Sequence, residues 1–166
     1  TEYLSRVGKA WKKSAPFEKH FGLYNGRIWG ACTSLSVEFD AVKKEFVVKL
    51  VHENTEDKKE STVEARLAED LRILEWKETG DRLGKAKAGD FQISSGSMTW
   101  KRLPKKGKPV VGEVKSGYCL GELPLYFPFF AAPSAGKPVS IPSLEGDGAF
   151  VLRLVESKED FYVAGK

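Results

Sequence analysis

The chain has 166 residues, of which 41% are hydrophobic and 30% are charged, as expected for one soluble globular domain with a real core. The aromatic content of 11% excludes disorder over most of the length. Lysine and arginine number 27 against 23 aspartates and glutamates, so the net charge of +4 permits an anionic partner without requiring one.

The first 14 residues are predicted to form a helix. Four apolar side chains recur there at helical spacing: Tyr3, Leu4, Val7 and Trp11. Pro16 ends the element, because the residue before a proline avoids the helical region. We therefore divide the chain into an N-terminal amphipathic helix (1–16) and a single antiparallel β domain (17–166). The helix either lies on the domain or serves as a basic arm for a partner or a membrane surface, and we favour the first interpretation.

The clearest strand signal covers residues 27–39. One face of that run is apolar or small, and the other carries polar side chains, which is the period of a strand with one buried face. A polar turn at 40–45 leads to a second alternating run at 46–51, so the two predict an antiparallel hairpin.

Residues 62–78 fit two interpretations. Ser61 to Glu64 matches a capping box, and Val63, Leu67 and Leu71 follow at helical spacing. Val63, Ala65 and Leu67 also alternate as a strand would. We favour a helix, because Glu, Ala, Leu and Arg dominate the segment, and a pair of strands is the alternative.

The second half predicts shorter elements. Apolar side chains alternate over residues 91–100, with a β-bulge expected at Gly96. A basic turn is expected at 101–109, short strands at 110–115 and 150–155, and a loop at 136–148.

These elements predict a mainly β fold: an antiparallel meander that closes into a small barrel or sandwich, with an N-terminal helix. A helix at 62–78 would make the fold α+β. The outline of a leading segment, an early tryptophan and successive hairpins resembles lipocalin-like barrels. Lipocalins carry Gly-x-Trp near the first strand, whereas residues 26–29 place one more residue between Gly26 and Trp29. The resemblance implies a shared architecture and not family membership.

The most unusual segment is 123–133, which holds eight apolar residues between three prolines. It is too short for a membrane span of about 20 residues, and proline disfavours both helix interiors and central strands. We predict an irregular, stiff connection that lines an interface or a ligand site. The residues assigned to that role are Leu123, Leu125, Tyr126, Phe127, Phe129, Phe130, Tyr3 and Trp11. At least two of the four aromatic residues at 126–130 are expected to be buried only when a partner or ligand is present.

Catalytic and metal motifs are not found. His20 and His52 are far apart in the chain, and Cys32 and Cys119 each lack a nearby second cysteine, so neither a zinc site nor any other cofactor is expected. The two cysteines are expected to be free, partly buried thiols, with a disulfide left open. An enzyme is less expected than a non-catalytic protein, although a triad built from distant positions stays open.

A basic cluster offers an anion site. Its members are Trp100, Lys101, Arg102, Lys105, Lys106 and Lys108. In a single-stranded nucleic-acid binder the cations would contact phosphates while the tryptophan stacks on a base. An ordinary solvated turn between two strands is the favoured interpretation, so a nucleic-acid partner is not expected.

Three functions follow, in order of preference. The first is a non-catalytic accessory or structural subunit that docks on protein partners in a larger assembly through the apolar, proline-rich segment. The second is a small β-barrel that binds an apolar ligand, either a lipid or a pigment. The third is single-stranded nucleic-acid binding. Thr1 in place of a methionine, together with the basic balance, favours an organellar interior (mitochondrion or plastid) over secretion.

Overall fold

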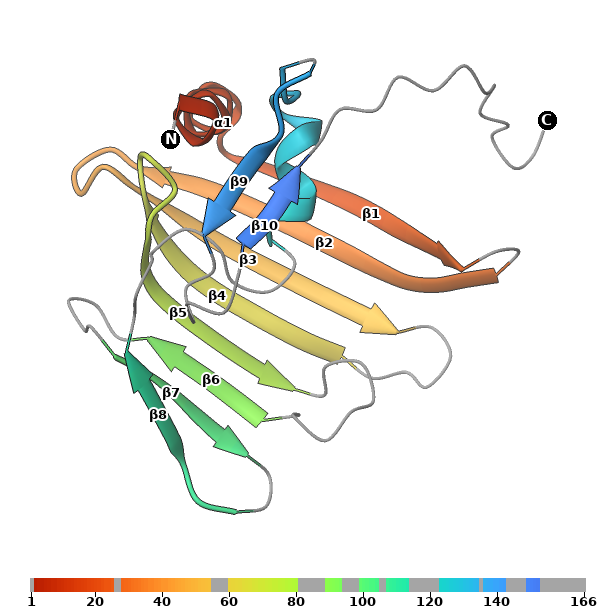
Figure 1. The fold of residues 1–166 in the computed structure, drawn as a ribbon, viewed down its shortest axis with the longest axis vertical. Helices are drawn as coiled ribbons and strands as arrows, with labels where there is room; N and C mark the ends of the chain where they lie inside the picture. Colours follow the sequence, from red (N-terminus) through yellow and green to blue (C-terminus); the bar gives the residue numbers. More distant parts are fainter. Residues whose placement is uncertain are drawn as a thin grey trace.

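The computed structural model describes residues 2–25, 28–54, 60–80, 89–93, 99–104, 107–113, 123–134, 136–142 and 149–152. Within them the chain is mainly β, with one long N-terminal helix, a short 3-10 helix and two antiparallel sheets (Figure 1). The predicted mainly β, antiparallel class is therefore confirmed.

The larger sheet is a meander, in which every strand pairs antiparallel with the next one in the chain. Its strands are β1 (Phe17–Asn25), β2 (Ile28–Asp40), β3 (Glu45–Asn54), β4 (Glu60–Ala68), β5 (Ile73–Gly80), β6 (Gly89–Ile93), β7 (Thr99–Pro104) and β8 (Val110–Glu113). The β2–β3 pair is the hairpin predicted from alternation. Among the strand pairs of the described residues none joins β1 to β8, so closure into a barrel stays a prediction.

The helix favoured for residues 62–78 is wrong, and the strand alternative is right. β4 and β5 occupy the segment and meet at a tight turn, where Leu71 has a left-handed φ of 66°. The backbone N–H of Leu71 donates to the carbonyl of Ala68, and Asp70 accepts from the N–H of Arg72. Helix propensity is a weak preference, and it is overridden by pairing with β3 in a sheet that buries Val63 and three further residues of β4.

Several other elements differ from expectation. The strand β1 had not been predicted, and residues 101–104 of the supposed basic turn belong to β7. The supposed loop at 136–148 contains β9 (Val139–Pro142), which pairs with β10 (Ala149–Leu152) in a separate two-stranded sheet. Proline terminates β9, which is compatible with a short edge element. The bulge expected at Gly96 lies outside the described residues.

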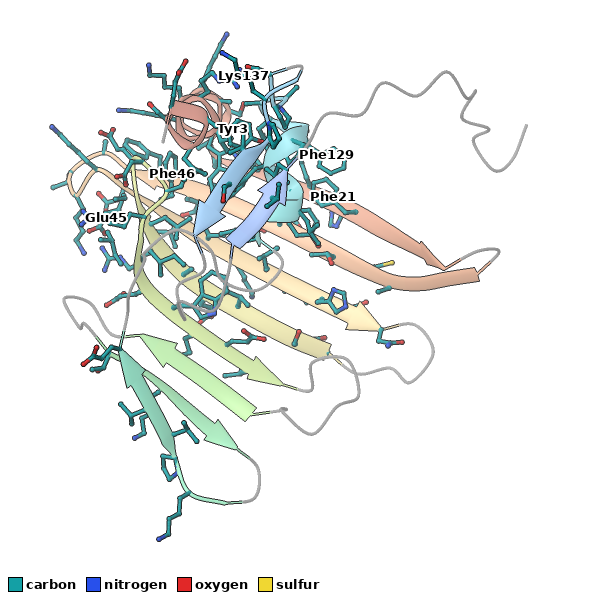
Figure 2. The ribbon with its side chains drawn as sticks, in the orientation of Figure 1. Tyr3, Phe21, Glu45, Phe46, Phe129 and Lys137 are labelled. Carbon is teal, nitrogen blue, oxygen red and sulfur yellow. The ribbon has the colours of Figure 1, made fainter. Side chains whose placement is uncertain are left out.

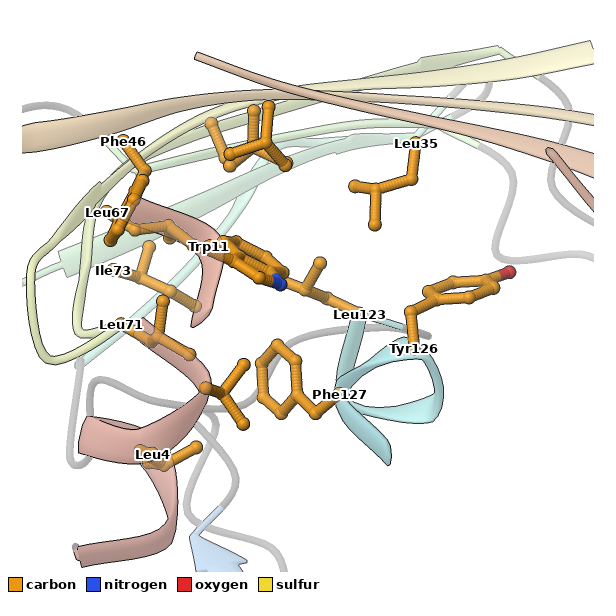
Figure 3. Packing of buried hydrophobic residues seen from close by; sticks show 14 of the residues in the cluster. Leu4, Trp11, Leu35, Phe46, Leu67, Leu71, Ile73, Leu123, Tyr126 and Phe127 are labelled. Atoms are coloured by element: carbon orange, nitrogen blue, oxygen red, sulfur yellow. The ribbon is translucent and has the colours of Figure 1, made fainter. Parts of the chain in front are cut away.

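Helix α1 (Glu2–Ser14) confirms the N-terminal prediction and packs on one face of the sheet beside β9, β10 and the 3-10 helix η1 (Leu123–Phe129) (Figure 1). Trp11 is completely buried between α1, the sheet and η1, and it contacts Phe46 and Phe127 edge to face at centroid distances of 5.7 and 5.8 Å (Figure 3). The indole of Trp11 therefore links α1, the sheet and η1 in one core.

Gly8 explains how α1 approaches the sheet so closely. A Cβ at this position would come closer than 3.0 Å to the carbonyl oxygen of Glu69, in the turn between β4 and β5. Glycine weakens a helix by about 1 kcal/mol relative to alanine, but here it lets the helix backbone touch the turn. Lys12 completes the contact with a salt bridge to Glu69.

The apolar segment 123–133 begins as a regular element. Its first part forms η1, a 3-10 helix that contains Pro128 and ends with the N–H groups of Phe130 and Ala131 both donating to the carbonyl of Phe127. The prediction of irregular structure is therefore wrong for residues 123–129, because a short 3-10 helix has few hydrogen bonds for a proline to break. No helix in the described part of the chain is long and apolar enough to cross a membrane.

Candidate docking surface

The helix η1 sorts the apolar segment into an inner and an outer face. Leu123, Tyr126 and Phe127 are buried, whereas Leu125 is 43% exposed and Phe129 is 68% exposed. In a 3-10 helix residues three apart stack above one another, so Leu123, Tyr126 and Phe129 form one row, which is buried at Leu123 and Tyr126 and reaches solvent at Phe129. The same seven residues thus anchor the helix and present large apolar side chains to solvent.

The anchors on the inner face are aromatic. Phe127 has no exposed surface and packs against Trp11, while the Tyr126 ring lies 4.7 Å from the Phe21 ring of β1. Burying aromatic side chains in this way contributes several kcal/mol of hydrophobic stabilisation and fixes their rotamers. The backbone of η1 is therefore held rigidly against the sheet.

The outer face continues onto the edge strand β1. Phe129 lies beside Phe21 (Figure 2), with 4.8 Å between their ring centres, and the ring centres of Phe130 and Phe17 are 5.0 Å apart. Together with Leu125 these residues form what we call the η1–β1 aromatic surface: Phe17, Phe21, Leu125, Phe129 and Phe130. Leu125 and Phe129 are exposed, and the three other phenylalanines are partly buried against the core. Apolar surface that is clustered in this way is typical of interaction sites.

A positive charge lies on the same face of β1. The Lys19 ammonium lies 5.7 Å from the centre of the Phe130 ring, a cation–π distance, and Lys19 stands between Phe17 and Phe21 in the strand alternation. A charged side chain pointing inward on an edge strand discourages another strand from adding to that edge. The edge of β1 is therefore poorly suited to the addition of another strand.

The opposite face of β1 is polar. His20 Nδ1 lies 2.9 Å from the Ser34 hydroxyl, and His20 Nε2 lies 3.6 Å from the Glu18 carboxylate. These contacts are exposed and contribute little to stability, but they separate a polar outer side of the edge strand from its aromatic inner side.

The structure distributes the predicted interface residues between two environments. Five of them fill the chain's own core: Tyr3, Trp11, Leu123, Tyr126 and Phe127. Leu125 and Phe129 are exposed, and Phe130 is partly buried against the core. Any partner reaches the segment through these three, and the dependence of burial on a partner stays a prediction for Phe129 and Phe130.

The predicted anion site is only partly described. Trp100, Lys101 and Arg102 belong to β7, where Lys101 pairs with Val111 of β8 and is exposed. Lys108 is exposed just before β8, and Lys105 and Lys106 lie outside the described residues. The cluster is thus split between a strand and a connection, and it shares no element with the aromatic surface.

Groups suited to metal binding or catalysis are sparse. The described residues contain no cluster of three or more His, Cys, Asp or Glu side chains that could hold a metal ion. Cys32 is a free thiol, and it is exposed and not partly buried as expected; Cys119 lies outside the described residues. His52 Nδ1 lies 2.8 Å from the Thr33 hydroxyl in a buried contact.

That contact belongs to a polar row on the inner face of the sheet. Thr33, His52 and Ser61 lie opposite one another on β2, β3 and β4, and all three are buried. Phe21 is the partner of Thr33 on β1, so the row reaches the strand that carries the aromatic surface. A polar row within an apolar face is a place where a ligand's polar group can be recognised.

Three residues of the aromatic surface region had been missed. Phe17, Lys19 and Phe21 alternate along β1, and reading residues 17–23 at a period of two would have found them. The alternation is short and interrupted by a lysine, so it is weaker than the one in β2.

Comparisons of the chain with models of protein families, with curated proteins and with solved structures gave no match.

Proposed function

We propose that this chain is a non-catalytic accessory protein that docks on a partner protein through the η1–β1 aromatic surface. The observation that carries the proposal is the contrast between two neighbouring phenylalanines of η1: Phe127 is fully buried, while Phe129 is 68% exposed. Because most of the Phe129 ring stays in solvent, the ring stabilises the isolated chain much less than a buried phenylalanine would.

Aromatic anchors near the centre of an interface carry much of the binding energy, and pre-organised ones lose little conformational entropy on binding. Phe129 meets the condition of pre-organisation, because η1 is anchored by Phe127 and Tyr126 and the ring rests on Phe21. The surface therefore supports a compact interface centred on Phe129.

The partner's chemistry follows from the charge beside the rings. Lys19 is exposed at the edge of the surface and lies over Phe130. We infer a partner that offers an apolar pocket with acidic side chains on its rim, because complementary rim charges speed association and exclude wrong partners.

The test compares Phe129→Ser with wild type. Proteins captured from an extract of the native cells by both baits are compared, and any protein lost with the variant is purified and titrated directly. Because truncating a central aromatic anchor costs about 2 kcal/mol or more, the dissociation constant should rise by about 30-fold. Lys19→Gln should slow association and weaken its salt dependence.

The matched control is Val42→Ser, which changes a 93% exposed apolar residue in the β2–β3 turn. This variant should bind the partner as wild type does. A partner that binds Phe129→Ser equally well overturns the proposal, and so does a wild-type chain that captures nothing and binds no apolar dye. Concentration-dependent self-association abolished by Phe129→Ser would assign the surface to a second copy of the chain instead.

A second candidate function is supported by the buried polar row. We propose as the alternative that the inner face of the sheet holds an apolar ligand whose polar group meets His52 and Thr33, with the sheet curling into a barrel around it. The covering helices lie toward the β2–β3 turn in Figure 1, whereas the row lies toward the other ends of those strands. Native mass spectrometry of the purified protein should show a bound small molecule, and an unliganded mass under gentle conditions contradicts this alternative.

A further inference from the structure

A groove runs between α1 and the segment that leads into β9. Its volume is about 620 Å³. Five of its lining side chains can donate hydrogen bonds: Tyr3, Arg6, Ser134, Lys137 and Ser140. Figure 2 shows Tyr3 and Lys137 at the end of the molecule where α1 passes the start of β9. None of the five belongs to the η1–β1 aromatic surface.

The backbone brings these donors together. Arg6 Nη2 donates to the carbonyl of Ala132 at 3.2 Å, which holds the guanidinium against the segment while its other N–H groups stay available. The N–H of Lys137 donates to the carbonyl of Ser134 at 3.3 Å, in a turn where Gly136 has a φ of 71°. That turn needs a residue tolerant of the left-handed region, and it brings together Ser134 and Lys137, which both line the groove.

Tyr3 provides an independent indication of a ligand. Its side chain is 4% exposed and lines the groove, and its hydroxyl has no hydrogen-bond partner in the part of the chain that the structure describes. Burial raises the pKa of Tyr3 to about 12. At neutral pH the hydroxyl carries its proton, as any tyrosine hydroxyl does, and can donate a hydrogen bond. A buried hydroxyl without a partner is unfavourable, and a ligand oxygen would satisfy it.

We propose that this groove binds the phosphate group of an organic phosphate. A phosphate offers three strong acceptor oxygens, and Arg and Lys are its usual cationic partners. Among the described residues that line it, the groove has two cations, Arg6 and Lys137, one carboxylate, that of Glu2, and three hydroxyl donors. The shared chemistry is the phosphate monoester, whether free in solution or carried by a lipid headgroup.

The experiment titrates the full chain calorimetrically with glycerol 3-phosphate and, separately, with vesicles that contain phosphatidic acid. Saturable binding to either probe, with a dissociation constant of about 1 mM or below, is expected. Arg6→Gln and Lys137→Gln should each weaken binding about tenfold, because each removes a charge-assisted hydrogen bond. The vesicle arm alone would respond if the source is a lipid. Lys13→Gln, on the same helix but outside the groove, is the control and should bind as wild type does.

Tyr3→Phe separates a ligand-binding role from a structural one. The variant should bind the responsive probe about fivefold more weakly, because one hydrogen bond is lost. Its melting temperature without the probe should be unchanged or higher, since the hydroxyl that it removes has no described protein partner. Absence of binding to both probes, or binding that is insensitive to Arg6→Gln and Lys137→Gln together, overturns the proposal without touching the docking function.

Discussion

Replacing each of two phenylalanines of η1 by alanine tests the fold and the docking surface together. Phe127→Ala removes a ring with no exposed surface that packs against Trp11, and Phe129→Ala removes a ring that is 68% exposed. The two positions share a residue type and a helix, so helix propensity and unfolded-state effects nearly cancel between them. The difference in unfolding free energy therefore reports burial.

The magnitude follows from the exposures. Truncating a fully buried Phe to Ala costs about 3–5 kcal/mol, because transfer and cavity costs add. Phe129 keeps only about a third of the burial worth about 2–3 kcal/mol for a whole ring, so its loss costs about 1 kcal/mol. With a urea m-value of about 2 kcal/mol/M, the two unfolding midpoints should differ by about 1–2 M.

Urea unfolding followed by tryptophan fluorescence gives both midpoints, because Trp11 is in the core beside Phe127. Equal midpoints for the two variants, or a larger loss for Phe129→Ala, would refute the assignment of an inner and an outer face to η1. The η1–β1 aromatic surface would then have to be abandoned as well.

Three further predictions concern α1 and the β2–β3 turn. Gly8→Ala should destabilise by about 1–3 kcal/mol in chemical unfolding despite the better helix propensity of alanine, because its Cβ would collide with the Glu69 carbonyl; a stabilised variant would show that α1 lies farther from the sheet. The folded pKa of Tyr3, about 12, lies above the unfolded value of about 10, so the free energy of unfolding is unaffected by this group below pH 10 and falls by about 2–3 kcal/mol as the pH rises to 12. Tyr3→Phe should lack that part of the loss, and identical plots of stability against pH for the variant and wild type would contradict the burial of the hydroxyl. The backbone N–H groups of Lys43 and Val42 donate to the carboxylate of Asp40 and lower its pKa, so the charged group stabilises the fold above the unfolded pKa of about 4, and this stabilisation is lost as the pH falls through the folded pKa. The difference in urea midpoint between wild type and Asp40→Ala should therefore shrink on acidification, and a difference that does not change with pH would exclude the charge as its source.

Local pattern was sufficient where one periodicity dominated over many residues. Strands β2 and β3 alternate without interruption, and the apolar face of α1 recurs at helical spacing up to Pro16, so both were predicted. Residues 62–78 satisfied two periods at once, and only the pairing of β4 with β3 and β5 decides between them. The strand β9 is too short to carry a period and exists because β10 pairs with it.

The candidate docking surface was likewise predictable from the sequence only in part. Composition alone identified 123–133 as the candidate functional segment, since eight apolar side chains between three prolines fit neither a plain helix nor a plain strand. Which of those side chains point inward depends on contacts with Trp11 and Phe21, which lie more than a hundred residues earlier in the chain. A sequence determines local period and apolar content, because both arise from neighbouring residues. Burial of Phe127 and exposure of Phe129 are decided by packing between distant segments, which only the tertiary structure brings together.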